Sequence, residues 1–225
     1  AQPTEDAAKI EVVEFFSYGC PHCADFNPLL SAWVAKQQGD VVVKKVPITF
    51  GRAAWANIAK LYYALEITGD LARLDGAVFN AIHAKGLRLV DEKSITEWVT
   101  SQGVDARKFS DAWNSFALNT KVSRGNQLAQ SARINGVPAI MVDGRYLVDG
   151  RNPKDMLAMT DKVINKRRAE IGLRRAVGAS GPSVLKQIIA EALVLTTFAV
   201  ALGSFFAVQF PLMHVFNLET QTYLE

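Results

Sequence analysis

The sequence predicts an α/β fold with an inserted helical block and a C-terminal tail of different character. Two apolar, β-branched stretches, Lys9–Gly19 and Val41–Phe50, flank a segment whose apolar residues have helical spacing. Apolar residues then recur at helical intervals from Arg52 to about Ile134. Strand character returns in INGVPAIMVDGRYLVDG, residues 134–150. Together these stretches indicate a sheet interrupted by helices.

The first fifty residues are predicted to form a βαβ unit. Its helix carries apolar residues at Phe26, Leu29, Leu30, Trp33 and Val34. A parallel pairing of the two strands with a right-handed crossover is expected for such a unit. A chain of 225 residues can bury its core without disulfides, so the two cysteines are not needed to hold a small fold together.

The helical block has expected breaks at Gly69-Asp70, Lys85-Gly86 and Gln102-Gly103. Within it, the pattern in DEKSITEWV makes Ser94 an expected N-cap, with Glu97 three residues later. This block is therefore read as an insertion between the two halves of the sheet.

After the block, Asp143-Gly144 between AIMV and RYLV is a hairpin signal. The stretch NPKDMLAMTDKVINKRRAE, residues 152–170, is amphipathic and is expected to close the domain as a helix against the sheet.

The domain division follows from these patterns. We expect one domain from residues 1–51 and 134–168, an inserted helical domain from 52–133, and an apolar helical tail from 169–225.

The formal net charge of +3 is modest and does not indicate a nucleic-acid surface. The polar start AQPTEDAAKI is not a signal peptide. A start at Ala-Gln-Pro without Met is what a signal peptidase leaves, so we expect secretion with the signal peptide removed, although a trimmed chain would look the same.

The stretch EFFSYGCPHCADF places Cys20 and Cys23 at a strand-to-helix junction. A sulfur at the start of a helix lies near unsatisfied N–H groups and the positive end of the dipole, which favour thiolate over thiol. Pro21 suits the first helical position because its missing N–H costs nothing there. His22 can donate to the Cys20 sulfur or place a positive charge nearby. Cys23, one turn inside the helix, is close enough to attack a mixed disulfide formed at Cys20. These features predict a redox-active pair in which one sulfur can be attacked and the other can resolve.

Three alternative roles for Cys20 and Cys23 are a zinc site, haem attachment and a structural disulfide. A structural zinc site needs two more ligands, and beyond His22 only His83 and His214 exist, at no recognisable spacing. Haem attachment needs His after the second cysteine, where Ala24 stands. A structural disulfide closing so short a loop would restrict the unfolded chain little. We therefore predict no metal and no cofactor.

The quoted residues resemble a known family. VVEFFSYGCPHCADF, residues 12–26, is similar to the active-site strand and helix of the DsbA family of periplasmic thiol oxidases. The likeness continues through FSDAWNSFALNTKV, residues 109–122, and INGVPAIMVDGRY, and covers about residues 10–165. It implies a thioredoxin fold with a helical insertion, and an enzyme that introduces disulfides into secreted proteins.

The resemblance also implies residue roles. Cys20 corresponds to the attacking thiol, Cys23 to the buried resolving thiol, and His22 to the residue that holds Cys20 as thiolate. Val137-Pro138 resembles the loop that faces the active site, with a cis proline, and leaves the Val137 backbone open to an extended substrate.

Glu14 and Lys45 resemble the charged pair beneath the active site, a proton relay to Cys23. Without the resemblance, Glu14 and Lys45 could equally be an ordinary Glu at the end of a strand and an exposed Lys on a strand. The implied partners are reduced or unfolded secreted proteins and a quinone-linked DsbB-type membrane oxidase, in the periplasm. A reductase or isomerase of the same fold remains an alternative.

The C-terminal tail, residues 169–225, differs from the rest of the chain in its apolar composition. Residues 192–210 are nineteen residues without a charge, long enough for a transmembrane helix. Gly203 and Ser204 suit a close helix contact in lipid. We expect membrane contact through residues 188–210, and keep open a helix pair that folds onto the first domain.

The tail also resembles the end of the permease domain of MacB/FtsX-type ABC transporters, through EIGLRRAVGAS and LKQIIAEALVLT. The alternative function is thus a membrane component of an ABC export system. The cations ahead of the span place its N-terminal side in the cytoplasm by the positive-inside rule, which conflicts with a periplasmic oxidase. They are Lys166, Arg167, Arg168, Arg174, Arg175 and Lys186. A tethered oxidase, a joined chain and a tail that never inserts remain open, and a joined chain is preferred.

Overall fold

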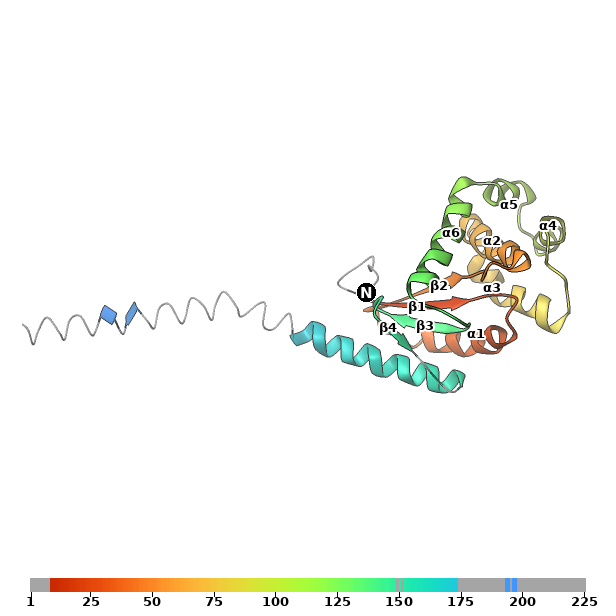
Figure 1. Cartoon of the computed structure of the whole chain (residues 1–225). Helices are drawn as coiled ribbons and strands as arrows, with labels where there is room; N and C mark the ends of the chain where they lie inside the picture. The colour runs from red at the N-terminus through yellow and green to blue at the C-terminus, as the bar shows by residue number, and fades with distance from the viewer. Residues whose placement is uncertain (1–8, 149, 151, 174–192, 195, 198–225) are drawn as a thin grey trace, which may run out of the picture. The chain divides into compact units, whose positions relative to one another are not determined.

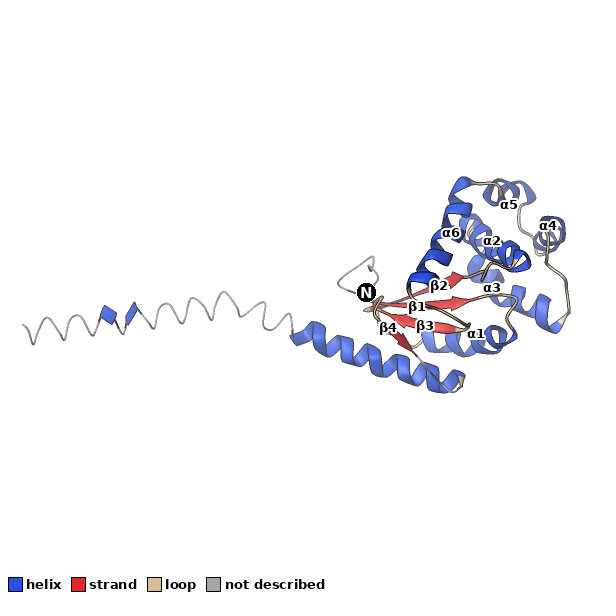
Figure 2. Ribbon diagram, in the orientation of Figure 1, coloured by secondary structure: helices blue, strands red, loops and turns tan. Residues whose placement is uncertain are grey.

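The computed structural model describes residues 9–148, 150, 152–173, 193–194 and 196–197. The chain divides into two compact units, Ala1–Arg168 and Ala169–Glu225. The first unit is an α/β fold in which helices cover both faces of a sheet (Figures 1 and 2). The predicted fold class is confirmed for this unit.

The βαβ unit forms as predicted, from β1 (Ile10–Phe16), α1 (Pro21–Val34) and β2 (Val41–Pro47). The two strands pair in parallel, from Ile10 beside Val41 to Phe16 beside Pro47. Both strands begin in apolar, β-branched sequence, which favours the extended backbone because branched side chains pack well on a pleated surface.

The other half of the sheet is a hairpin. β3 (Ala139–Val142) pairs antiparallel with β1, and β4 (Tyr146–Val148) pairs antiparallel with β3, so that the strand order is β2-β1-β3-β4. Asp143 and Gly144 have φ angles of 51° and 60°. Both lie in the left-handed region that a tight hairpin turn demands, which confirms the predicted turn.

Five α-helices and one π-helical turn separate the two halves of the sheet within the described residues. They are α2 (Ala53–Thr68), α3 (Leu71–Phe79), η1 (Asn80–Ala84), α4 (Glu92–Ser101), α5 (Ala106–Trp113) and α6 (Phe116–Ser131). Gly69 directly follows α2, and its φ of 84° is the left-handed conformation typical of the residue that ends a helix. The predicted helical insertion is therefore present.

The predicted N-cap at Ser94 is wrong, because Asp91 caps α4. The Asp91 carboxylate accepts from the Ser94 backbone N–H at 2.8 Å, and the Ser94 hydroxyl oxygen accepts from the Asp91 backbone N–H at 3.4 Å. The helix begins at Glu92. Two capping-type residues three positions apart cannot be ranked from sequence, since either can accept from a free N–H two or three residues ahead.

The two faces of β1 pack against different helices. Val13 and Phe15 face a cluster that includes Ala129 of α6, whereas Phe16 belongs to a cluster with Cys23 of α1. This alternation follows from the two-residue period of a strand. Glu14 therefore points to the same face as Phe16, toward α1.

An aromatic cluster joins the end of β1 to the insertion. The Phe16 ring lies 5.1 Å from Tyr18 and 5.4 Å from Tyr62 of α2, and Tyr18 lies 4.8 Å from Phe79 of α3, as centroid distances. Edge-to-face pairs of this kind add about 0.5–1.5 kcal/mol each beyond buried area. The insertion is thus anchored next to the residues that follow β1.

The predicted closing helix covers residues 153–173. Arg167 donates to Asp143 at 2.6 Å in a buried ion pair, and Arg168 makes two bonds to Asp40, at 2.7 and 2.9 Å. Trp33 of α1 donates to Asp161 at 2.9 Å. Arg167 and Arg168 are therefore paired inside the first unit. Both are among the cations on which the positive-inside prediction depends.

The predictions for residues 188–210 lie outside the described residues except at 193–194 and 196–197. Six residues named in the sequence analysis also lie outside them: Arg174, Arg175, Lys186, Gly203, Ser204 and His214. Among the helices that the structure does describe, none is both long and apolar enough to cross a bilayer.

Candidate active site

The Cys-Pro-His-Cys segment begins α1 as predicted. Cys20 is the N-cap residue, with φ −96° and ψ 118°, and Pro21 is the first helical residue. The Cys20 carbonyl oxygen accepts from the backbone N–H groups of Cys23 and Ala24, both at 3.1 Å. The Cys20 sulfur thus sits at the positive end of the helix dipole, and both cysteines are free thiols here.

The surroundings of Cys20 favour its thiolate. A hydrogen bond from the Cys23 thiol is the main cause that lowers the pKa of Cys20, to about 6, while burial opposes it. The backbone N–H groups of Cys23 and His22 and the His22 charge lower the pKa further. His22 is exposed, and among the described residues no ring hydrogen bond joins it to Cys20. Of its two predicted contributions, the charge is therefore the one that the geometry supports.

Cys23 has the opposite tendency. It donates its hydrogen bond to Cys20 and its side chain has no exposed surface, and both effects raise the pKa of Cys23 far above that of an ordinary thiol. Cys20 retains 7% of its surface exposed. Of the two sulfurs, only Cys20 is both ionisable at neutral pH and reachable.

Val137 and Pro138 lie against the cysteine pair, although 117 residues separate Cys20 from Val137. The Cys20 sulfur lies 3.4 Å from the Val137 carbonyl oxygen, and the Val137-Pro138 peptide bond is cis. Val137 is half-buried and contacts both hydrophobic clusters. The structure thus brings the predicted loop to the Cys20 sulfur.

Glu14 and Lys45 are neighbours because the β1–β2 register pairs them directly. Lys45 Nζ lies 3.6 Å from Glu14 Oε2, which is longer than a hydrogen bond. Glu14 is completely buried, and neither of its oxygens accepts a hydrogen bond from the described residues. Burial raises the pKa of Glu14 to about 7, against an opposing effect of Lys45.

Three polar residues around Lys45 were not predicted from the sequence. Lys45 Nζ donates to Asn27 of α1 and to Asp75 of α3, each at 2.7 Å, and the Tyr18 hydroxyl donates to the other Asp75 oxygen at 2.7 Å. Asn27 lies one turn after Cys23 on the same helix, which is a usable signal. Asp75 comes from the insertion, and no local pattern points to it.

Trp55 was also missed. It packs on Gly19, the residue before Cys20, so closely that a Cβ at Gly19 would lie 2.8 Å from Trp55 Nε1. Phe50 and Arg52 contact the same indole, at 6.0 and 4.8 Å from its ring centroid. An aromatic surface thus adjoins the reactive cysteine, and Gly19 allows that close approach.

His83, one of the histidines considered as zinc ligands, is hydrogen-bonded to the backbone. His83 Nε2 lies 2.7 Å from the Tyr18 carbonyl oxygen, which can only accept, so Nε2 carries the hydrogen. In the part of the chain that the structure describes, no three His, Cys, Asp or Glu side chains gather in a metal-binding group.

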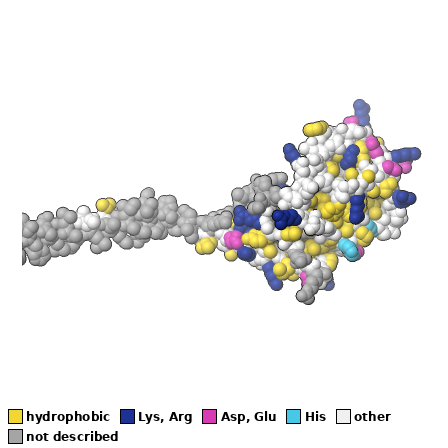
Figure 3. Space-filling model, viewed as in Figure 1, with side chains coloured by type: hydrophobic (Ala, Val, Ile, Leu, Met, Phe, Trp, Pro, Cys, Tyr) yellow, Lys and Arg dark blue, Asp and Glu magenta, His cyan; other side chains and the backbone are white. Residues whose placement is uncertain are grey.

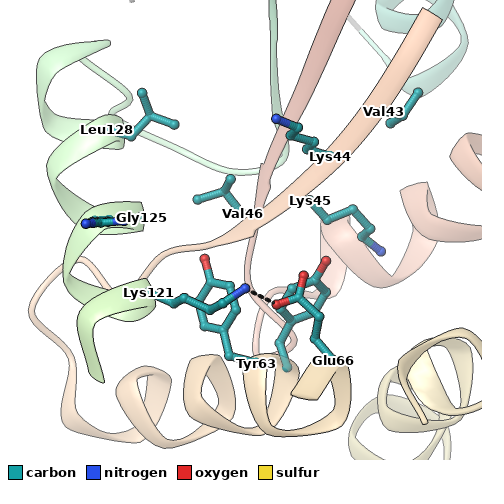
Figure 4. Close-up of a pocket in the computed structure, with 11 residues that line it drawn as sticks. Val43, Lys44, Lys45, Val46, Tyr63, Glu66, Lys121, Gly125 and Leu128 are labelled. Carbon is teal, nitrogen blue, oxygen red and sulfur yellow. Dashed lines mark hydrogen bonds and ion pairs between the residues drawn. The ribbon is translucent and has the colours of Figure 1, made fainter. Parts of the chain in front are cut away.

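A cleft of about 580 Å³ lies between β2, α2 and α6. Figure 4 shows the Lys121–Glu66 ion pair across it, 2.6 Å long, with Lys45 at one end. On the face drawn in Figure 3, Lys and Arg side chains are scattered among hydrophobic ones. Lys45, which lies beside the buried Glu14, also lines this cleft, and 17% of its side chain is exposed.

Two family models match the chain. The model of the DSBA-like thioredoxin domain matches residues 11–160, and the model of the FtsX-like permease C-terminal region matches residues 156–221. The first covers most of the described residues, and the second falls mainly outside them.

Curated relatives and solved structures agree with the first match. The thiol:disulfide interchange protein DsbA of Bordetella parapertussis is 41% identical over 170 residues, covering 74% of this chain and 80% of the relative. The crystal structure of Pseudomonas aeruginosa DsbA superposes with a TM-score of 0.72 and 34% identity, over 76% of this chain and 90% of that one. The oxidoreductase DsbA from Xylella fastidiosa gives 0.69 and 36%, over 72% and 88%.

Proposed function

This chain belongs to the DsbA family of thioredoxin-fold proteins, and from that premise we propose that substrates attack its Cys20 sulfur and that Cys23 is the resolving sulfur. The chain is a thiol:disulfide oxidoreductase that introduces disulfides by dithiol–disulfide exchange. The observation that carries the assignment of roles is the asymmetry of the pair: the pKa of Cys20 is lowered to about 6, whereas that of the wholly buried Cys23 is raised.

The proposed cycle starts from the Cys20–Cys23 disulfide. A substrate thiolate attacks Cys20 and forms a mixed disulfide, and the electron pair of the broken bond passes to Cys23, which takes up a proton. A second substrate thiolate then attacks the substrate sulfur of the mixed disulfide and releases Cys20 as thiolate. The substrate is oxidised and the pair is left as one thiolate and one thiol. Because the surroundings stabilise the Cys20 thiolate, reduction of the pair is favourable, which makes its disulfide oxidising.

The neighbouring residues have supporting roles in this proposal. Pro21 starts the helix that stabilises the thiolate, and the His22 charge adds to that effect. Val137 and Pro138 bind the substrate chain, because the Val137 carbonyl lies beside the sulfur that the substrate attacks.

We further propose that Glu14 and Lys45 form a proton relay to Cys23. The Glu14 charge is one of the causes that raise the pKa of Cys23, so the two groups are electrostatically coupled. A carboxyl whose pKa is raised to about 7 can give and regain a proton near neutral pH.

The proposed setting follows from the family. The substrates are reduced or unfolded secreted proteins, the pair is reoxidised by a quinone-linked membrane oxidase of the DsbB type, and the location is the periplasm, where thiols are not kept reduced. The proposed domains are residues 1–51 with 134–168, 52–133, and 169–225. Membrane contact through residues 188–210 stays a prediction from the sequence.

Neither alternative function is favoured. The FtsX-like match is the one observation behind the export reading, and it covers residues 156–221 only. The relatives that are 41% identical and cover 74% of the chain are DsbA thiol:disulfide interchange proteins, which also disfavours the reductase or isomerase hypothesis.

The assignment of roles is tested with two single-cysteine variants of the full chain and glutathione disulfide. Cys23→Ser should accumulate one glutathione adduct on Cys20 below pH 7, because the resolving thiol is absent. The matched variant Cys20→Ser should form none, because its remaining thiol is buried and protonated. An adduct that forms on Cys23 as readily as on Cys20 would overturn the proposed roles, and equilibration of the wild-type pair with glutathione separates oxidase from reductase.

A further inference from the structure

Asp75 links the inserted helices to the buried charges beneath the active site. It lies on α3, while its two partners come from elsewhere: Lys45 from β2 and Tyr18 from the segment that follows β1. Both bonds are 2.7 Å long. One carboxylate oxygen accepts from each partner, so the Asp75 side chain is oriented from two sides.

These contacts commit the Lys45 ammonium to Asp75 and Asn27. An ammonium has three donors, and two of them go to Asn27 Oδ1 and Asp75 Oδ2 at 2.7 Å. The distance to Glu14 is 3.6 Å. The Phe16 ring lies 4.7 Å from the same ammonium and occupies a further side of it. Lys45 is thus held within ion-pair distance of Glu14 but makes no short hydrogen bond to it.

The cluster has two carboxyl groups and one ammonium, so the two carboxyl groups differ in how well their charge is compensated. Asp75 accepts two hydrogen bonds and keeps 19% of its side chain exposed. Glu14 has no exposed surface and accepts no hydrogen bond from the described residues. An ionised carboxylate is costly in such a place, so Glu14 is the group that keeps a proton.

We infer that Asp75 is a positioning residue for the exchange reaction: by binding the Lys45 ammonium it prevents Lys45 from bonding to Glu14, and it thereby keeps Glu14 able to hold the proton that Cys23 takes up. This inference rests on the proposed relay. When a substrate thiolate attacks Cys20, the electron pair of the disulfide passes to Cys23, the proton moves from Glu14 to Cys23, and Glu14 becomes a carboxylate. Lys45 and Asp75 reach solvent, so water can return the proton.

The titratable groups coupled to Glu14 come from five segments. The charges of Lys45 (β2) and Asp75 (α3) act on the pKa of Glu14, and the Glu14 charge raises the pKa values of Cys23 (α1), Tyr62 (α2) and Tyr18, which follows β1. On its other side, β3 places the apolar Ile140 beside Glu14. Burial is the largest cause that raises the pKa of Glu14, Lys45 lowers it, and the Asp75 charge raises it. Removing the Asp75 charge should therefore act on Glu14 twice, directly and by releasing Lys45.

The test measures the proton of Glu14 directly in the reduced full chain. The carboxyl carbons of ¹³C-labelled glutamate are followed by NMR against pH, and the Glu14 signal is identified by its loss in Glu14→Gln. In the wild type the signal should titrate near pH 7. In Asp75→Asn its midpoint should fall by about one pH unit or more, as expected when a like charge is removed and an opposite charge is freed.

The matched control is Asp70→Asn, one turn earlier in sequence, whose carboxylate pairs with Arg73 at the surface. It should leave the Glu14 midpoint unchanged, and Asp75→Glu, which keeps the charge, should restore most of it. If Asp75→Asn does not fold, Asp75→Ser removes the same charge with a smaller side chain and should give the same shift.

The rate at which a small dithiol reduces the Cys20–Cys23 disulfide supplies a second readout. Expressed per thiolate of the dithiol, this rate should fall as Glu14 loses its proton, and the fall should occur about one pH unit lower in Asp75→Asn than in wild type. A Glu14 midpoint that Asp75→Asn leaves in place would overturn the inference. If Asp75→Asn lowers the midpoint but Glu14→Gln leaves the exchange rate unchanged, the relay is overturned, and with it the role of Asp75 in the exchange reaction; the lowered midpoint then supports only the part in which Asp75 holds Lys45 away from Glu14.

Discussion

The ionisation of Cys20 should be visible both in its reactivity and in the stability of the reduced chain. The pKa of Cys20 is lowered from 9.0 to about 6 in the folded protein, chiefly by the hydrogen bond from Cys23. At pH 7 Cys20 should then be about 90% thiolate, whereas an ordinary thiol with a pKa of 9 is about 1% thiolate. Alkylation by iodoacetamide should therefore reach half of its plateau rate near pH 6.

The same shift sets a pH dependence of stability. Because the folded pKa lies below the unfolded pKa, ionisation of Cys20 stabilises the folded reduced chain. This contribution is complete above pH 9 and is lost as the pH falls through about 6. Between pH 5 and pH 8 the linkage integral is about 2.6 kcal/mol. Half of that, about 1.3 kcal/mol, is expected, because the sulfur lies at the surface end of α1 where solvent screens its charge.

The assay compares urea unfolding of the reduced chain and of Cys20→Ser at pH 5 and pH 8. Cys20→Ser keeps every other titrating group, so the change in the difference between the two proteins reports Cys20 alone. Tryptophan fluorescence reports the first unit, because all four tryptophans lie in it: Trp33, Trp55, Trp98 and Trp113. An alkylation midpoint near pH 9, or a difference in unfolding free energy that is the same at both pH values, would refute the reasoning.

Two further predictions concern single residues beside Cys20. His22→Leu should raise the alkylation midpoint of Cys20 by less than one pH unit, since the His22 charge is the smallest of the causes that lower this pKa and the backbone N–H of residue 22 remains; a lowered midpoint would contradict this. Gly19→Ala should destabilise the folded chain by about 1–3 kcal/mol, because its Cβ would overlap Trp55 and both must shift. Gly39→Ala, with no atom within 4 Å of the added Cβ, is the control in the same urea experiment, and equal losses from both changes would contradict the overlap.

The elements that could be predicted from sequence are those whose signals are local. The apolar, β-branched stretch of β1, the Pro21 start of α1 and the Asp143-Gly144 turn each depend on the backbone preferences of adjacent residues. The cap of α4 is local too, but it was assigned to Ser94 instead of Asp91, since the pattern contains two residues able to cap.

The buried cluster could be predicted only in part. Glu14 and Lys45 were found through the family resemblance, and the parallel register places them side by side. Asp75 and Tyr18 were not found, because their roles depend on how α3 docks against the end of β1. That docking comes from aromatic packing between Phe16, Tyr18 and Phe79, which has no signature at fixed spacing.

By itself, the sequence determined the order of strands and helices, the position of the cysteine pair at a helix start, and through the resemblance the family and its chemistry. Only the tertiary structure decided how the Cys23 thiol and the Val137 carbonyl lie against the Cys20 sulfur and which partners surround Glu14. The physical reason is the range of the interactions. Helix starts and strand faces depend on neighbours a few residues apart, whereas the pKa values of Cys20 and Glu14 depend on burial and on charges contributed by segments far apart in the chain.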